Sequence, residues 1–298
     1  MVTCHLTRLR RTIAAAAGCS LSRLCVLSCA EPRSHVKAMR RRIACLGDSN
    51  VEGYRGGLFG FNLLSPHAWP AELQALLGER YEVVNLGSSG ATVGKHGRDG
   101  CGDVIASASY WDREPFRAFV AGRWDVVILM IGGNDSKVVS AGAVADNWRG
   151  EEAFAKDYAE LIALAKTLGT SEEREPTVFA CTPPPVLCTN AGPIQSTIVN
   201  GVLPGLVRRI AAEHGAHTVE IFEAVGGGDV LAGRIPPEGL TAGFVNANPT
   251  SAPAMYFYAE ADESVGGVWC DQVHPCDAGF VRIAQVLAEH VRGLGLIE

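Results

Sequence analysis

A chain of 298 residues, 47% hydrophobic and 19% charged, can bury one large core or two modest ones, and no run approaches the roughly 18 apolar residues that span a bilayer. Nine Lys and Arg against one acidic residue give residues 1–42 a charge of +8, so the net charge of −6 leaves −14 on the remainder. A body this acidic argues against binding nucleic acid or anionic lipid through its main surface.

Residues 1–38 form a basic N-terminal extension. They are rich in Arg, Ser and Ala, contain one acidic residue and lack hydrophobic periodicity, a composition typical of an organellar transit peptide. A secretory signal is less favoured, because Arg23 interrupts what would be its apolar core. Translation starting at Met39 is a third interpretation and would leave a cytoplasmic protein. In each case we expect the fold within residues 39–298.

From residue 42 onward, strand patterns alternate with helix patterns. The run 124–131 is almost entirely apolar, as a parallel strand covered on both faces should be. Helices are indicated by apolar residues at helical spacing and by glycines where that spacing stops. The predicted strands are 42–47, 81–87, 124–131, 177–181 and 218–222. The predicted helices are 70–77, 151–168, 198–214 with a kink or a start at Pro204, and 278–291 with Asp277 as its cap.

Two segments do not fit this alternation. A Gly-rich loop is expected over 51–62, and residues 226–270 are rich in Gly, Pro and Asn. An irregular segment as long as the second is usually functional or disordered in a compact domain. Five strands alternating with helices predict a three-layer α/β/α sandwich with a five-stranded, mostly parallel sheet.

Four polar turns follow strands or precede the last helix. They are Gly47-Asp-Ser-Asn50, Gly87-Ser-Ser-Gly90, Gly132-Gly-Asn-Asp135 and Asp271-Gln-Val-His274-Pro275. Ligands of open α/β sheets bind beyond the carboxyl ends of the strands, so Ser49 is well placed to act as a nucleophile. In this order the four blocks resemble the SGNH hydrolase superfamily, the GDSL-type esterases, named after its Ser, Gly, Asn and His. The resemblance runs from about residue 42 to the C-terminus and implies a flavodoxin-like fold.

The resemblance implies a serine esterase mechanism. A serine hydroxyl is a weak nucleophile until a base removes its proton. That base would be His274, with Asp271 three residues earlier orienting the imidazole and stabilising its charge. An oxyanion hole would be formed by the backbone N–H groups of Ser49 and Gly90 and the side-chain amide of Asn134. The resemblance implies neither a metal nor a cofactor.

Each of these residues also has a purely structural interpretation. His274, beside a proline, could be a surface or capping residue. Gly90 could be a turn glycine with positive φ, and Asn134 could close an Asx-turn. We expect Asp48 and Asp135 to fix loops rather than to transfer protons.

Further features resemble one branch of the superfamily, the sialate O-acetylesterase-like carbohydrate acetylesterases. They are Gly-Ala-Thr after the second block, Asn134-Asp-Ser-Lys137 with Asn147-Trp148 downstream, and Pro183-Pro-Pro185. The chain departs from the pattern at Asn50, where many members have Leu, and in the long tract 226–270, where a short connection is usual. That tract could reshape the acyl or sugar pocket.

Three aromatic residues of that tract are candidate substrate contacts. Tyr256, Tyr258 and Trp269 could stack on a sugar ring, because aromatic side chains offer apolar faces with polar handles. The alternative is that they pack the tract onto the body of the protein.

The cysteines give little information about the compartment. Six cysteines in residues 39–298 are too few for a disulfide scaffold. Bridges Cys181–Cys188 or Cys270–Cys276 would form only in an exported protein. A metal site around Cys270, His274 and Cys276 is disfavoured, because the sequence holds no second ligand cluster.

These observations together predict an esterase that hydrolyses a small ester, with acetyl as the favoured acyl group, on a sugar-like substrate through an acyl-enzyme. A lysophospholipase or thioesterase on the same fold is the enzymatic alternative. A catalytically silent carbohydrate-binding protein is the alternative from another class. The oligomeric state does not follow from the sequence.

Overall fold

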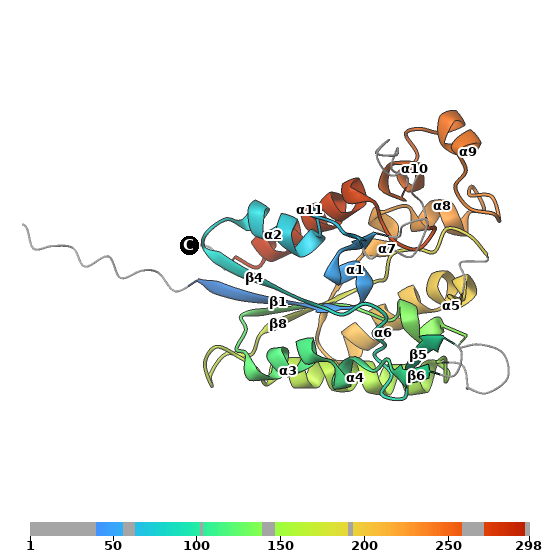
Figure 1. Ribbon diagram of the computed structural model, residues 1–298. Helices are drawn as coiled ribbons and strands as arrows, with labels where there is room; N and C mark the ends of the chain where they lie inside the picture. Colours follow the sequence, from blue (N-terminus) through green and yellow to red (C-terminus); the bar gives the residue numbers. More distant parts are fainter. Residues whose placement is uncertain are drawn as a thin grey trace, which may run out of the picture. The chain divides into compact units, whose positions relative to one another are not determined.

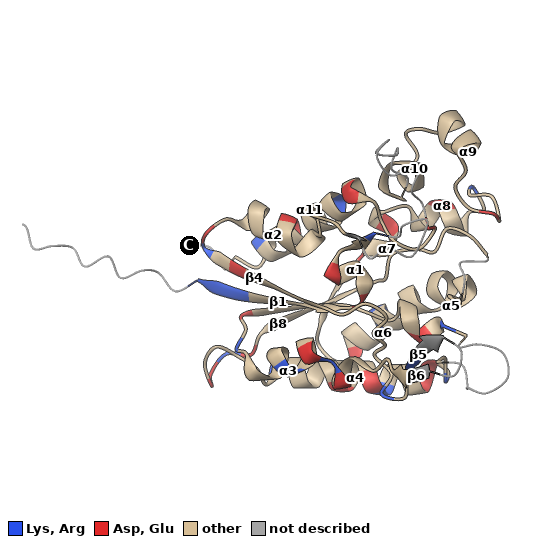
Figure 2. Ribbon diagram, in the orientation of Figure 1, with Lys and Arg blue, Asp and Glu red and all other residues tan. Residues whose placement is uncertain are grey.

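The computed structural model describes residues 40–55, 63–101, 104–138, 147–189, 193–257 and 271–295. All of them belong to one unit, Ala38–Glu298. In this part of the chain, no helix is both long and apolar enough to cross a membrane. Figure 2 shows acidic and basic residues on the outer helices, while the start of the first strand is basic.

A five-stranded parallel sheet forms the centre of this unit (Figure 1). Its strands lie in the order β4-β1-β7-β8-β9, and every neighbouring pair is parallel. The strands are β1 (Arg41–Gly47), β4 (Tyr81–Gly87), β7 (Val126–Met130), β8 (Thr177–Cys181) and β9 (His217–Val219). The predicted five-stranded sheet is therefore confirmed.

Three neighbouring strands, β4, β1 and β7, end at the same level. Gly47, the last residue of β1, pairs with Gly87 of β4 and with Met130 of β7. Parallel strands that end together bring the turns that follow them to one edge of the sheet. The first three polar turns of the sequence therefore start side by side.

Helices cover both faces of the sheet, as Figure 1 shows. On one face lie α2 (Trp69–Leu77) and α11 (Asp277–Gly293). On the other lie α3 (Glu114–Ala121), α4 (Glu151–Lys166) and α6 (Leu203–Glu213). This is the predicted three-layer α/β/α sandwich.

Strand β7 supplies side chains to both cores, because successive residues of a strand point to opposite faces. Val127 and Leu129 pack in the core under α3, α4 and α6, while Ile128 and Met130 pack in the core under α2 and α11. All five side chains of β7 are buried. Burying side chains of this size contributes about 1.5–3 kcal/mol each, so β7 anchors the turn that follows it.

Shorter elements surround the ends of the strands. The short helices are α1 (Ser49–Glu52), α5 (Ser196–Gly201), α7 (Ile221–Ala224), α8 (Gly227–Leu231), α9 (Ala242–Ala247), α10 (Ala252–Phe257), η1 (Tyr110–Asp112) and η2 (Gly133–Ser136). Two small antiparallel pairs are β2 (Tyr54–Arg55) with β3 (Leu63–Leu64), and β5 (Arg98–Cys101) with β6 (Val104–Ser107).

Several elements differ from the sequence-based expectation. The segment expected as a loop after Ser49 begins with the helix α1. The predicted strand 218–222 is wrong at its end, because β9 stops at Val219 and Phe222 lies in α7, where its N–H donates to Thr182 Oγ1 at 2.9 Å. The predicted helix 198–214 is interrupted at Val202, and Pro204 lies in the first turn of α6. The tract 226–257 forms α8, α9 and α10, and the rest of the tract lies outside the described residues.

The expected cap of the last helix also needs correction. The cap residue of α11 is Cys276, without a side-chain cap bond, while Asp277 is the first helical residue and its carboxylate bonds elsewhere. Cys181 and Cys276 are free thiols. Neither of the two bridges considered from the sequence is therefore formed.

Candidate active site

Ser49 is presented by a tight turn between β1 and α1. It is the first residue of α1, and the Asp48 carboxylate caps that helix by accepting the Asn50 N–H at 3.0 Å. Gly87, at the end of the neighbouring strand β4, lets α1 approach the sheet closely, since a Cβ there would lie 2.1 Å from Glu52 N. The Ser49 side chain is thereby held at the carboxyl edge of the sheet, with the residue 8% exposed.

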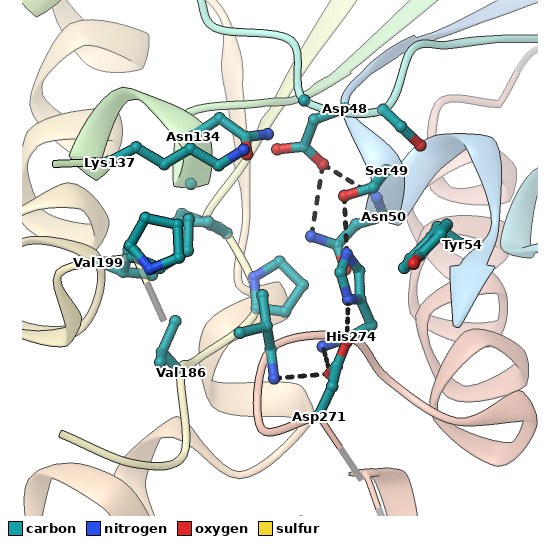
Figure 3. A pocket seen from close by; sticks show the side chains of 18 residues that line it. Asp48, Ser49, Asn50, Tyr54, Asn134, Lys137, Val186, Val199, Asp271 and His274 are labelled. Carbon is teal, nitrogen blue, oxygen red and sulfur yellow. Dashed lines mark hydrogen bonds and ion pairs between the residues drawn. The ribbon is translucent and has the colours of Figure 1, made fainter. Parts of the chain in front are cut away.

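His274 and Asp271 reach Ser49 from the opposite end of the sequence (Figure 3). His274 Nε2 lies 2.8 Å from Ser49 Oγ, and His274 Nδ1 lies 2.5 Å from Asp271 Oδ2. The Asp271 Oδ1 atom accepts the N–H groups of Val273 at 3.0 Å and His274 at 2.7 Å. These backbone bonds fold the short segment so that one turn carries both the imidazole and the carboxylate that orients it.

The surroundings of Asp271 keep its carboxylate ionised. Burial raises the pKa of Asp271, but the hydrogen bond and charge of His274 and the two backbone N–H bonds outweigh that effect. The pKa of Asp271 therefore lies below its ordinary value of 3.8. An ionised carboxylate at Nδ1 holds the imidazole with Nε2 directed at Ser49.

Asn134 and Gly90 line the same pocket as Ser49. Asn134 lies in η2 directly after β7 and is 7% exposed. Its side-chain Nδ2 donates to Ala91 O at 3.1 Å, and its backbone carbonyl oxygen accepts from Asn147 Nδ2 at 3.2 Å. Gly90 has a φ of 76°, which favours glycine. The three oxyanion-hole residues expected from the resemblance therefore face one cavity.

The carboxylate of Asp135 ties two loops together. It is 3% exposed and accepts the N–H groups of Val93 at 3.0 Å and Gly94 at 2.8 Å. Burial, with a smaller contribution from the Asp48 charge, raises the pKa of Asp135 to about 7, although the two N–H bonds oppose this rise. Burial also raises the pKa of Asp48, and the Asn50 N–H opposes that rise.

The pocket has a volume of about 500 Å³ and two unlike sides. Figure 3 shows Ser49 and His274 on one side of the pocket, Val186 and Val199 on the opposite side, and Asn134 and Lys137 along the edge between them. The apolar wall consists of Pro183, Pro184, Val186, Pro193, Ile194 and Val199.

Some of the residues that line the pocket could not be identified from the sequence. Tyr54 lines the pocket and packs edge-on against the His274 ring, with 4.8 Å between ring centroids and 61° between planes. It lies just after the nucleophile turn, in a stretch without a recognisable motif. Val186 and Val199 also carried no signal beyond their hydrophobicity. The prolines of Pro183-Pro-Pro185 stand out in the sequence only as a feature of one branch of the superfamily.

One of the three predicted aromatic contacts, Tyr256, can be compared with the pocket. Tyr256 is not among the residues that line it; its ring packs against the core under α2 and α11, and its carbonyl oxygen accepts the Cys276 N–H at 2.8 Å. This is the packing role that the sequence left as the alternative. Tyr258 and Trp269 lie outside the described residues.

A match to a known family agrees with this arrangement. Residues 45–280, more than half of the chain, match the model of the GDSL-like Lipase/Acylhydrolase family. The chain belongs to this family. The resemblance to the GDSL-type esterases is thereby confirmed, and with it the expectation of a carboxylic ester hydrolase at the level of the family.

Individual relatives of this GDSL-family chain are distant. An acetylxylan esterase from Xylanibacter ruminicola is 24% identical over 193 residues, which are 60% of this chain and 36% of that protein. The structure of a carbohydrate acetylesterase from Sinorhizobium meliloti is 18% identical, with a TM-score of 0.58 over 86% of this chain and 100% of that one. The aryl esterase of M. smegmatis is 19% identical, with a TM-score of 0.55 over 85% of this chain and 99% of that one. These structures share the fold.

Proposed function

We infer that the protein is a serine esterase that removes a small acyl group, acetyl above all, from a carbohydrate-like substrate through an acyl-enzyme. The observation that supports this most directly is the hydrogen-bonded series from Asp271 through His274 to Ser49, with lengths of 2.5 and 2.8 Å. This series ends at the wall of a pocket large enough for a small ester.

Acylation begins with attack of Ser49 Oγ on the ester carbonyl carbon. As the Oγ–C bond forms, the Ser49 proton passes to His274 Nε2, which lies 2.8 Å away. Asp271 stabilises the imidazolium that results. The tetrahedral intermediate then breaks its bond to the alcohol oxygen, which leaves with the proton from His274 Nε2.

Deacylation repeats these steps with water in place of Ser49. His274 removes a proton from the water as it attacks the acyl carbon, and then returns a proton to Ser49 Oγ as the carboxylic acid leaves. In both halves the oxyanion accepts hydrogen bonds from the N–H groups of Ser49 and Gly90 and from Asn134 Nδ2. Asn134 Nδ2 carries two hydrogens, and its bond to Ala91 O requires only one of them.

Two observations support a small acyl group on a sugar-like substrate. The acetylxylan esterase and the carbohydrate acetylesterase among the relatives act, by their names, on acetylated carbohydrates. The pocket also carries polar groups beside the nucleophile, including Asn50 and Ser89, that could bond to sugar hydroxyls.

A second candidate is a lipid or thioester hydrolase on the same fold. The apolar wall of six residues favours it, because an alkyl chain placed there would be removed from water. The two candidates differ in the length of the acyl chain that the pocket should prefer.

The test is hydrolysis of nitrophenyl acetate, butyrate and octanoate by the full-length protein, followed by acetate release from acetylated xylan. We expect kcat/KM to be highest for acetate and to fall between butyrate and octanoate. Activity that rises towards octanoate would overturn the small-acyl proposal and favour the lipid or thioester candidate.

A silent carbohydrate-binding protein is tested separately. A fluorophosphonate probe reacts covalently with an activated serine, so labelling at Ser49 is expected for the esterase. Xylan binding without any labelling would instead favour the binding protein.

A further inference from the structure

The segments that carry Ser49 and His274 are joined by one carboxylate outside the pocket. Asp277 lies three residues after His274, at the start of α11. Arg55, in β2, donates from Nη1 to Asp277 Oδ2 at 2.8 Å, and Ser65 Oγ donates to Asp277 Oδ1. Arg55 and Ser65 are more than two hundred residues away from Asp277 in the sequence. Their contacts with Asp277 therefore connect the stretch that follows Ser49 to the stretch that follows His274.

The nucleophile side of this connection is tightly built. Gly53 ends α1 with a φ of 96°, and a Cβ there would lie 2.3 Å from Ala68 Cβ, so the chain turns directly from α1 into β2. The Gly53 carbonyl accepts the Ser65 N–H at 2.8 Å. A displacement of Arg55 or Ser65 would therefore be transmitted to α1 and to Ser49.

Ser65 is fixed before it meets Asp277. It is 6% exposed, and its Oγ accepts the His67 N–H at 2.9 Å, which leaves the hydroxyl proton to be donated to Asp277. Tyr54, the neighbour of Arg55, packs its ring edge-on against His274 at 4.8 Å. The β2–β3 pair thus contacts the segment 274–277 at two points, the imidazole and the carboxylate.

We propose that Asp277 is a positioning residue, which holds the His274 segment against β2 and Ser65 and so sets the distance between Ser49 Oγ and His274 Nε2. This rests on the proposed roles of Ser49 and His274. The Arg55 and Asp277 side chains are 42% and 36% exposed, and ion pairs with this exposure contribute little to folding stability. Their effect is on geometry, and a shift of about 1 Å at a reacting pair can lower the rate about a hundredfold.

The test compares Asp277→Ala with a matched control, Glu220→Ala. Glu220 pairs with Arg208 at 2.7 and 2.8 Å, the two side chains are 45% and 41% exposed, and neither residue lines the pocket. For nitrophenyl acetate, we expect Asp277→Ala to lower kcat about tenfold or more, with KM little changed and with slower fluorophosphonate labelling of Ser49. Glu220→Ala should leave all three unchanged.

Two further variants keep the proposal falsifiable if Asp277→Ala does not fold. Arg55→Met removes the partner of Asp277 and should also lower kcat. The charge-exchanged pair Arg55→Asp with Asp277→Arg restores the ion pair and should recover part of the lost kcat.

The outcomes separate this inference from the proposed function. A folded Asp277→Ala protein with the kcat of an active wild type overturns the positioning role alone, as does an Arg55→Met protein with unchanged kcat. A wild type without Ser49-dependent hydrolysis overturns the proposed function and the positioning role together.

Discussion

Asp135 is expected to make folding stability depend on pH in the range in which activity would be assayed. Its buried carboxylate accepts the N–H groups of Val93 and Gly94, and burial raises its pKa from 3.8 to about 7. The native protein therefore binds the Asp135 proton more tightly than the unfolded chain does. The contribution of this protonated carboxyl to the free energy of unfolding is fully present below about pH 4. It is lost as the pH rises through about 7.

The size of the effect follows from the two pKa values. With 3.8 for the unfolded chain and about 7 for the native protein, the contribution of Asp135 to the unfolding free energy falls by about 2–3 kcal/mol between about pH 5 and pH 8. The carboxylate of Asp271 acts outside this range, because its pKa is lowered and its titration lies below about pH 4.

The assay is urea unfolding of wild type and Asp135→Asn at several pH values from 5 to 8. The side-chain amide of the Asn variant does not titrate. Its NH₂ group is a donor and would face one of the two backbone N–H donors, Val93 or Gly94, so one hydrogen bond is lost and the variant is less stable than wild type at pH 5. The difference in unfolding free energy should shrink by about 2–3 kcal/mol by pH 8. A difference that stays constant with pH would refute the raised pKa of Asp135.

Three further substitutions address the site. Asn134→Ala removes one oxyanion donor and should lower kcat for nitrophenyl acetate about 10²- to 10³-fold with little change in KM; an effect on KM alone would contradict that role. Asp271→Asn should favour the wrong imidazole tautomer and lower kcat about 10⁴-fold. A loss below tenfold would argue against His274 as the base. Asn147→Ala removes the side-chain hydrogen bonds to the Arg98 backbone and to Asn134 O. It should lower the free energy of unfolding, measured in urea, by about 1–3 kcal/mol. An unchanged free energy of unfolding would contradict a stabilising role for these bonds.

Much of the sheet could be predicted because its strands are short apolar runs with sharp ends. The predicted ranges 81–87 and 177–181 coincide with β4 and β8. Gly87 and the prolines at 176 and 183 mark these ends in the sequence. The polar turns could be placed at one edge for the same reason, since parallel strands end together.

Other elements depend on contacts that sequence patterns do not encode. Ile221 and Phe222 have the hydrophobic character of a strand, but the bond from Phe222 N–H to Thr182 Oγ1 starts a helix there instead. The link between Arg55 and Asp277 joins residues 222 positions apart. Asp277 resembled a helix cap in the sequence, and only the fold brings Arg55 and Ser65 to its carboxylate.

That Ser49 is the nucleophile is tested most directly by comparing full-length wild type and Ser49→Ala in two assays, nitrophenyl acetate hydrolysis and fluorophosphonate labelling. Ser49→Ala should lose both activities while its melting temperature stays close to that of wild type, because the hydroxyl faces the pocket and not the core. Hydrolysis by Ser49→Ala at the wild-type rate would contradict the assignment of Ser49, and with it the serine esterase mechanism.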